Sequence, residues 1–204
     1  FLGWNPGTEQ EIFSRDELIE AFSLERVGKS GAKFDIEKAR WFNQQYLNEM
    51  PGDKLATYLE AALREHGIEN TELDLVRIAE VMKGRVVFPS DFWNNGSFFF
   101  GLPESYDEKV VNKKWNSTAV ETLSAYADTI QDNKNLSPDD AKLLLNNLLE
   151  EKGVKLGQVM QALRLAISGT GSGPDLMEII SILGGPEVHN RISHARSSLP
   201  VTST

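Results

Sequence analysis

The sequence contains no cysteine, which excludes disulfide bonds, cysteine-ligated zinc and thiol catalysis. It also lacks any apolar run of the roughly 18–20 residues that cross a bilayer, and no basic segment followed by an apolar one opens the chain as a secretory signal would. No Gly-rich phosphate-binding loop, metal-binding cluster or nucleophile triad is present. We therefore expect no catalytic residue, no metal site and no cofactor in this chain, and no membrane partner.

Histidine, the side chain most often used in acid–base chemistry, occurs only three times. His66 falls at the end of a predicted helix, and His189 and His194 fall on the last predicted helix. Their positions favour a structural role for all three.

The chain is acidic, with a net charge of −9 over 204 residues, and this balance taken alone argues against nucleic-acid binding. Net charge describes the whole surface, however, whereas binding needs only one basic face. Three groups of basic residues stand out: Arg77, Lys83 and Arg85; Lys109, Lys113 and Lys114; and Arg191, His194 and Arg196. Each group predicts either a phosphate-binding face or simply a solvated helix face.

The composition is that of a globular protein, 40% hydrophobic and 25% charged, and the length is enough for one or two domains with real cores. The chain begins with Phe1-Leu-Gly-Trp4, which is typical of the middle of a domain. We therefore expect it to be part of a longer protein.

Apolar residues recur at helical spacing, and no segment alternates as a strand would. Ser14-Arg-Asp-Glu17 has the pattern of a capping box that opens a helix through about Phe22. Further helices are expected after Asp35, over Lys54–His66, after Thr71–Asp74, from Thr118, from Ser137 and over Glu187–Ser198, followed by a frayed tail over Leu199–Thr204. The predicted fold class is all-α, with helical-bundle domains.

Several apolar sets are expected to form the core. They are Ile36, Ala39, Trp41, Phe42 and Tyr46; Leu55, Tyr58, Leu59, Ala62 and Leu63; and Leu144, Leu145, Leu148 and Leu149. The aromatic residues Phe92, Trp93, Phe98, Phe99 and Phe100 are also interpreted as core, with platforms for stacked bases as the alternative. Pro51-Gly52 and Leu102-Pro103 interrupt the helical pattern, so we expect three parts, 1–50, 51–102 and 103–204.

The most informative stretch is a predicted helix, loop and helix over residues 153–184. Leu156, Val159, Met160, Leu163 and Ile167 form an apolar stripe on the first helix. Gly169 is expected to end that helix in a left-handed conformation, and Pro174 suits the first turn of the next one. Arg164 lies near the loop. An arginine, exposed backbone groups and a helix N-terminus would therefore meet in one place, a suitable surface for a splayed-out nucleic-acid base.

The same stretch carries a resemblance to a known family. GVKLGQVMQALRLAISG (153–169) and GPDLMEIISILGG (173–185) resemble the C-terminal signature of bacterial-type glutamyl-tRNA synthetases, with Ala162 where proline is usual and Ser168 where threonine is usual. Near the start, LGWNP (2–6), FSLERV (22–27) and KSGAKFD (29–35) resemble the stem-contact region of that family. The two matches flank the chain in the family's order, so the resemblance covers nearly all of it.

The resemblance implies the end of a stem-contact domain over 1–50, followed by two helical anticodon-binding subdomains over 51–102 and 103–204. The parent enzyme would attach glutamate to tRNA-Glu with ATP and Mg²⁺, as a cytoplasmic monomer without a DNA partner. Its catalytic domain would lie outside this chain, which should then be inactive alone. The implied tRNA-binding residues are Arg85, Arg164, Gly173, Pro174, Asp175 and Leu176.

Arg85, near the family's "MKxR" pattern, is implied to read the last anticodon base. Glutamate anticodons end in C and glutamine anticodons end in G. An unpaired C offers two adjacent acceptors, N3 and O2, on its Watson–Crick edge, whereas an unpaired G presents two donors there. Because arginine can only donate hydrogen bonds, it would bond C and leave buried donors facing G. Asp175 would be unfavourable near phosphates unless it pairs with Arg164 or accepts from a base.

Lys29 and Lys33 are candidates for contact with the tRNA backbone, with simple solvation as an equal alternative. Lys29-Ser30 is not interpreted as an ATP loop, because the surrounding glycines do not form a phosphate-cradling pattern. The rival for the whole chain is a non-catalytic helical protein-interaction module, in which Arg85 and Arg164 would form surface ion pairs.

Overall fold

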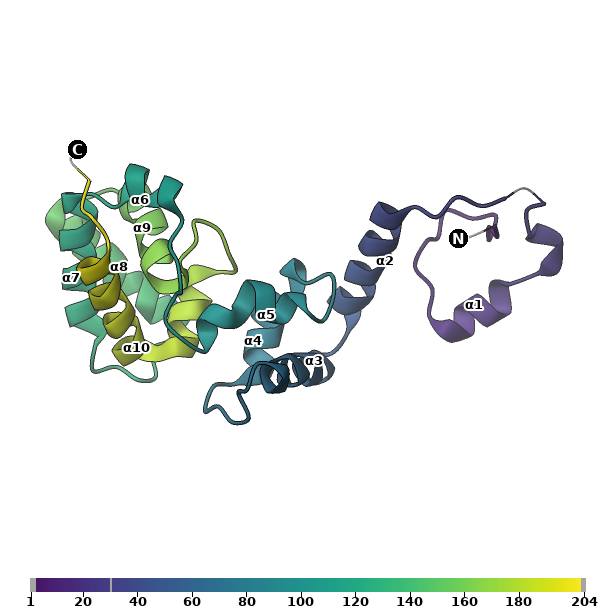
Figure 1. Cartoon of the computed structure of the whole chain (residues 1–204), viewed down its shortest axis with the longest axis horizontal. Coiled ribbons are helices and arrows are strands. Elements are labelled where there is room, and N and C mark those ends of the chain that lie inside the picture. Colours follow the sequence, from purple (N-terminus) through teal and green to yellow (C-terminus); the bar gives the residue numbers. More distant parts are fainter. Residues whose placement is uncertain (1–2, 30, 203–204) are drawn as a thin grey trace. The chain divides into compact units, whose positions relative to one another are not determined.

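The computed structural model describes residues 3–29 and 31–202. Within them it has ten α-helices, three short 3-10 helices and no strand, with only two isolated β-bridges (Figure 1). The all-α prediction is confirmed. The chain divides into two compact units, Phe1–Met50 and Pro51–Thr204.

The first unit contains α1 (Arg15–Ala21), the 3-10 helix η1 (Leu24–Arg26) and α2 (Ile36–Glu49). The Ser14 hydroxyl accepts a hydrogen bond from the Glu17 N–H, and the Glu17 carboxylate accepts one from the Ser14 N–H, so the predicted capping box is confirmed. Asp35 caps α2 as expected, by accepting from two N–H groups of its first turn.

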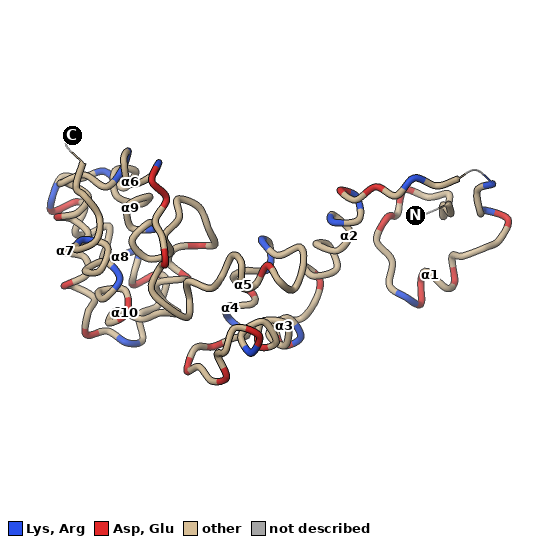
Figure 2. The backbone as a smooth tube through the Cα atoms, viewed as in Figure 1, with Lys and Arg blue, Asp and Glu red and all other residues tan. Residues whose placement is uncertain are grey.

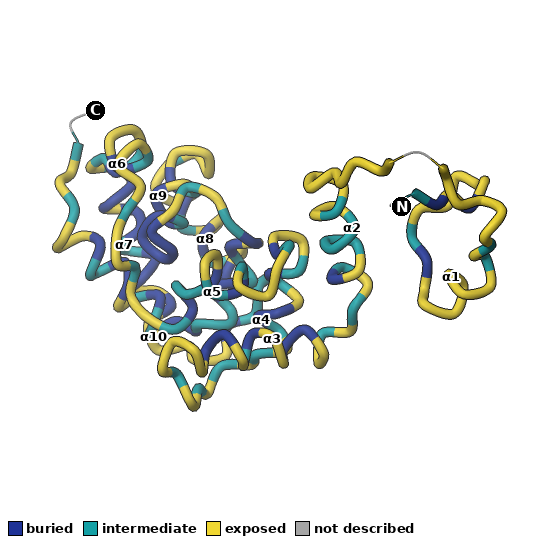
Figure 3. Tube along the Cα trace, turned by 45° about the vertical axis from the view of Figure 1, so that its right-hand side comes forward, coloured by how far each residue is buried: buried dark blue, intermediate teal, exposed yellow. Residues whose placement is uncertain are grey.

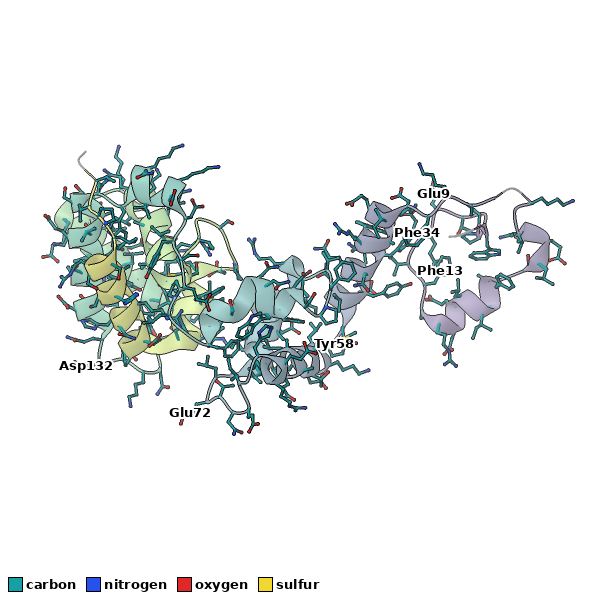
Figure 4. The ribbon with its side chains drawn as sticks, viewed as in Figure 1. Glu9, Phe13, Phe34, Tyr58, Glu72 and Asp132 are labelled. Atoms are coloured by element: carbon teal, nitrogen blue, oxygen red, sulfur yellow. The ribbon has the colours of Figure 1, made fainter. Side chains whose placement is uncertain are left out.

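The first unit buries little of the apolar surface that the sequence predicts for it. Trp4, Phe13 and Leu47 are buried, but Trp41 is 41% exposed and Tyr46 is 44% exposed. The expectation that Ile36, Trp41 and Tyr46 are core residues is therefore wrong for the described chain, because α2 turns only Leu47 fully inward. Figure 3 traces this unit mainly in the colour of exposed residues. Figure 4 labels Phe13 and Phe34 here, and Phe34 is exposed.

The second unit begins with α3 (Gly52–Glu65) and α4 (Leu75–Met82). Helix α4 continues directly into the 3-10 helix η2 (Lys83–Arg85). Next come α5 (Asp91–Gly96) and η3 (Ser97–Phe99), and α3 packs against both α4 and α5. The predicted core residues of α3 are buried except Tyr58, labelled in Figure 4, which is 37% exposed because it flanks the buried stripe. Within the predicted Thr71–Asp74 start, Asp74 is the residue that caps α4.

The remaining helices are α6 (Glu108–Lys114), α7 (Ser117–Ile130), α8 (Pro138–Lys152), α9 (Leu156–Ser168) and α10 (Leu176–Ser198). α10 packs against α7, α8 and α9, and α6 packs on α9 (Figure 1). The predicted start at Ser137 is confirmed, with Pro138 in the first turn. α7 begins one residue earlier than predicted, because the Asn116 side chain caps it. On α8, Leu145 and Leu149 are buried while Leu144 and Leu148 are half-buried.

Helix α9 is buried on more than one side. Val159, Leu163 and Ile167 of the predicted stripe are fully buried, but so are residues off the stripe such as Leu165. Leu156, the first residue of the helix and the first of the predicted stripe, is 42% exposed. Gly169 ends α9 with φ 76°, as predicted.

The last helix is two helical segments joined at a kink. Gly184 has φ 74° and ψ 160°, which is not helical, and Pro186 follows it. The kink lies between the helix predicted to end by residue 184 and the one predicted over Glu187–Ser198. A Cβ on Gly185 would collide with the Ile130 carbonyl oxygen, so the glycine permits close approach of α10 to the end of α7.

The predicted fraying of the C-terminal tail is wrong up to Thr202, and residues 203–204 lie outside the described chain. The Thr202 N–H donates to the Trp115 carbonyl at 2.9 Å, and the Thr202 hydroxyl donates to the same oxygen at 3.2 Å. Trp115 is itself fully buried, so it fixes the tail against the unit.

Candidate nucleic-acid interface

A cleft of about 930 Å³ lies in the second unit between two loop-rich walls. One wall comes from the segment between η2 and the start of α6, and the other from the loop that joins α9 to α10. Arg85, Gly173 and Pro174 line this cleft, so three of the six predicted anticodon residues are brought together although they are far apart in the sequence.

Arg85 stands on a backbone that its neighbours hold firmly. Met82 and Val86, on either side, are fully buried. The Arg85 carbonyl accepts a hydrogen bond from Asn95 Nδ2 at 3.1 Å, and the Asp91 carboxylate accepts from the N–H groups of Val87 and Phe88, each at 2.9 Å. The Arg85 side chain is exposed and makes no ion pair with any described residue. It is therefore a charged donor on a fixed turn.

Arg164, in the second-last turn of α9, is half-buried and its Nη1 atom is buried without a hydrogen-bond partner in the described chain. Burial lowers the pKa of the Arg164 guanidinium, the nearby positive charge of Arg85 lowers it further, and Asp175 raises it. Buried donors are almost always satisfied in native proteins. Arg164 therefore offers a buried donor that no described residue satisfies, within electrostatic range of Arg85.

The loop between α9 and α10 is short and internally bonded. Ser168 Oγ donates to the Arg164 carbonyl at 2.9 Å, and Thr170 Oγ1 donates to the Ser172 carbonyl at 2.7 Å. The Gly169 carbonyl accepts from the Asp107 N–H at 2.8 Å, which joins this loop to the opposite wall of the cleft. These bonds brace the loop internally and tie it to the opposite wall.

Asp175 is the cap of α10, because its carboxylate accepts hydrogen bonds from the N–H groups of Met177 at 2.9 Å and Glu178 at 3.1 Å. Helix α10 starts at Leu176, so the expected position of Pro174 in the first turn is wrong: Pro174 precedes the cap. Leu176 is 2% exposed, and its side chain belongs to the core in this structure. Its contact with a base stays a prediction.

The interpretation of the whole aromatic cluster as core is half right. Phe92 and Phe99 are buried, but Trp93, Phe98 and Phe100 are half-buried and line the cleft. Tyr106, for which no sequence pattern predicts a role, lines it too. Hydrophobic periodicity could not distinguish the buried rings from those that line the cleft, because α5 and η3 are too short to define a helix face. The His66 ring stacks on the ring of Trp93, with centroids 3.9 Å apart.

The family comparison agrees with this geometry. A sequence model described as "Anticodon binding domain" matches residues 37–196, and so includes both walls of the cleft. This chain belongs to the anticodon binding domain family.

The relatives of this anticodon-binding domain chain support the resemblance seen in its sequence. The glutamate–tRNA ligase of Cytophaga hutchinsonii is 46% identical over 200 residues, which are 98% of this chain and 39% of the relative. Crystal structures of glutamate–tRNA ligases from Elizabethkingia meningosepticum and Elizabethkingia anophelis are each 36% identical, with TM-scores of 0.88 and 0.83, over 98% and 97% of this chain and 39% of each solved chain. The chain thus spans about two fifths of these relatives.

Several other basic side chains of the anticodon-binding domain bond to groups within the protein. Arg77 Nη2 donates to Glu178 Oε2 at 2.7 Å and to Ser181 Oγ at 2.9 Å, which ties α4 to α10. Lys83 pairs with Glu80 at 3.4 Å. Arg191 is only 1% exposed, so the predicted basic face of Arg191, His194 and Arg196 is wrong for its first member. Figure 2 shows basic and acidic residues interspersed along the chain.

The first unit has a cavity of its own, of about 810 Å³. Lys33 lines it together with Arg26, Lys38 and the aromatic side chains of Trp4 and Phe42. Lys29 is exposed and does not line it. The motif residues Leu2 and Ser30 lie outside the described residues.

No three His, Asp or Glu side chains between residues 3 and 202, Ser30 aside, gather closely enough to hold a metal ion. In the same part of the chain, no helix has both the length and the apolar character of a membrane span.

Proposed function

We propose that the second unit reads the anticodon of tRNA-Glu and that the parent protein is a glutamate–tRNA ligase. The observation that carries this proposal is the buried Arg164 Nη1, which has no partner in the described chain and lies within electrostatic range of a second arginine, Arg85. A ligand with hydrogen-bond acceptors would relieve both the unused donor and the repulsion between the two charges. Single-stranded loop bases and their phosphates are such ligands.

Arg85 would discriminate between the bases of the last anticodon position. Its exposed guanidinium, on a fixed turn at the cleft, offers only donors. These donors match N3 and O2 of an unpaired C, whereas G would set N1–H and N2–H2 against them. The wrong base would therefore leave buried donors unpaired, which a protein site penalises strongly.

The cleft walls would hold the remaining anticodon bases. Gly173 and Pro174 line one wall, and Trp93, Phe98 and Phe100 line the other. Aromatic faces stack on bases of any identity, so these side chains would contribute affinity while the arginines contribute selectivity. Asp175 would act through α10, by capping the helix that follows the loop.

The first unit would supply the end of the stem-contact domain, with Lys33 and Lys29 meeting the phosphate backbone. Residues 51–102 and 103–204 would be the two helical subdomains of the reader. In the parent, a catalytic domain outside this chain would use ATP and Mg²⁺ to attach glutamate. We expect that parent to be a cytoplasmic monomer.

The rival function, a protein-interaction module, needs an exposed apolar surface on the second unit. The exposed large apolar residues of that unit are few: Tyr58, Val76, Phe88, Leu102, Leu143, Leu156 and Val201. They come from different elements, and single exposed apolar residues are ordinary on a globular surface. An RNA ligand therefore accounts better for the cleft and its two arginines.

Salt dependence separates the two functions. The affinity of the 204-residue chain for a tRNA-Glu anticodon stem-loop should fall about tenfold or more between roughly 50 and 200 mM salt, because several phosphate contacts release counterions. A stem-loop with the same stem and a scrambled loop is the control and should bind more weakly. Binding that is absent, or that does not respond to salt, would contradict the RNA-reading function.

A further inference from the structure

Arg191 is the most deeply buried charged side chain described in the second unit, and its guanidinium joins three separate segments. Nε donates to Glu187 Oε1 at 2.7 Å, within α10. Nη1 donates to the Ile167 carbonyl at 2.9 Å, in the last turn of α9, and also to the Phe98 carbonyl of η3. Burial lowers the pKa of Arg191, while Glu187 opposes that effect.

Each of the two carbonyls belongs to a segment that is bonded to the backbone of Arg164 or Arg85. Ile167 lies three residues beyond Arg164 on α9, and Ser168, next to it, donates its hydroxyl to the Arg164 carbonyl. Phe98 lies in η3, which directly follows α5, and Asn95 of α5 donates to the Arg85 carbonyl. One buried guanidinium therefore connects the segment that carries Arg85 to the helix that carries Arg164.

This connection matters because the two site arginines repel each other. The charge of Arg85 lowers the pKa of Arg164, so the spacing between the two guanidinium groups sets how strongly they interact. Arg191 also binds at both walls of the cleft. Phe98, whose carbonyl it binds, lines one wall, and Ser168, which follows the bound Ile167, lines the other. A planar guanidinium can serve two carbonyls and a carboxylate at fixed angles, which an ammonium group cannot do.

We propose that Arg191 is a positioning residue for anticodon reading: it touches no RNA and sets the spacing between Arg85 and Arg164. The inference rests on the proposed function and adds to it a residue outside the cleft. It implies that selectivity for the last anticodon base depends on a side chain that is 1% exposed. A purely structural role would lower the stability of the unit without changing selectivity.

The test compares Arg191→Lys with Tyr126→Phe in the 204-residue chain. Tyr126→Phe is the matched control, because it removes one buried hydrogen bond, from the Tyr126 hydroxyl to the Ala141 carbonyl, far from the cleft lining. Dissociation constants are measured for stem-loops that end the anticodon in C or in G, and thermal midpoints are measured for both variants. Arg191→Lys should reduce the preference for C by about tenfold, as expected when bonds from a charged donor are lost. Tyr126→Phe should leave that preference within about twofold.

A second arm identifies the residue through which Arg191 acts. Arg85→Ala should remove most of the C preference from the unsubstituted chain and much less from the Arg191→Lys chain, because the two sites are coupled. If Arg191→Lys does not fold, Glu187→Ala replaces it: Glu187 is 35% exposed, and its loss weakens the hold on the guanidinium while keeping both carbonyl bonds. That variant should reduce the preference in the same direction, by about threefold.

The outcomes distinguish this inference from the function on which it rests. An unsubstituted chain that prefers C, together with Arg191→Lys and Glu187→Ala variants that keep the full preference, would overturn the positioning role alone. Equal reduction by Tyr126→Phe would also overturn it, because the effect would then follow stability. An unsubstituted chain that shows no preference would overturn the proposed reading of the last base, and the role of Arg191 with it.

Discussion

The guanidinium of Arg164 occupies space that exists only because residue 173 is glycine. A Cβ at position 173 would stand 2.7 Å from Arg164 Nη1, closer than real side chains approach. The atom it would meet is the tip of a flexible side chain, which can swing away at little cost to the fold. Gly173 and Arg164 therefore form a pair in which the glycine keeps the arginine in position.

Gly173→Ala should weaken RNA binding without weakening the fold. The added methyl group displaces the Arg164 guanidinium, so affinity for the C-ending stem-loop should drop about tenfold, the usual scale for a misaligned charged contact. The thermal midpoint should change little. Gly157→Ala, in the same helix as Arg164, is the control, since a Cβ there meets nothing within 4 Å and should leave binding unchanged. A large loss of stability in Gly173→Ala would contradict this account.

Arg164→Met should raise or preserve stability while it removes binding. The substitution keeps an unbranched apolar stem and deletes a charge that is half-buried, lacks a partner for Nη1 and is repelled by Arg85. Chemical denaturation followed by circular dichroism measures the stability, and stem-loop titration measures the affinity. A clear fall in the unfolding midpoint would mean that the Arg164 charge stabilises the fold and does not serve to bind a ligand.

Asp175 should contribute to stability by capping α10, and its negative charge should not be needed for RNA binding. Asp175→Asn keeps a good capping side chain and should preserve stability, whereas Asp175→Ala should cost about 1 kcal/mol. Because a negative charge near Arg164 opposes an RNA phosphate, Asp175→Asn should bind the stem-loop as well as the unsubstituted chain or better. Loss of binding in Asp175→Asn would show instead that the carboxylate contacts the RNA.

Gly185→Ala tests the kink in α10. The new Cβ would collide with backbone, the Ile130 carbonyl oxygen, which cannot move as a side-chain tip can. The substitution should therefore destabilise the second unit by about 3 kcal/mol or more. Thermal melts measured against Gly157→Ala, which should be neutral or slightly stabilising, give the comparison. A midpoint that is unchanged would contradict the close contact between α10 and α7.

Local chemistry made much of the fold predictable, because Ser14, Asp35 and Ser137 cap helices through bonds within one turn. The left-handed Gly169 and the break at Gly184 follow from the same local rules. What could not be predicted depends on distant contacts. The buried Arg191 bonds to Phe98 and Ile167, 93 and 24 residues away, and the tail is held by Trp115 through Thr202. No sequence period encodes either.

The candidate site divides in the same way. The family signature points to Arg85 and Arg164, whereas their electrostatic interaction depends on how the helices pack. Trp93, Phe98 and Phe100 were assigned to the core, because a one-turn helix gives too little periodicity to separate a buried ring from a ring that faces a cleft. The resemblance implies that Asp175 binds RNA, but its hydrogen bonds are those of a helix cap.

The most direct test of the reader is the binding of the 204-residue chain, with and without Arg85→Ala, to two anticodon stem-loops that differ only in their last anticodon base. At low and high salt, the unsubstituted chain should prefer the C-ending loop by about tenfold or more, the scale of a good two-bond contact to a base edge. Arg85→Ala should bind both loops alike. Equal binding of both loops by the unsubstituted chain, or a C preference that survives Arg85→Ala, would contradict the assignment of Arg85 as the reader.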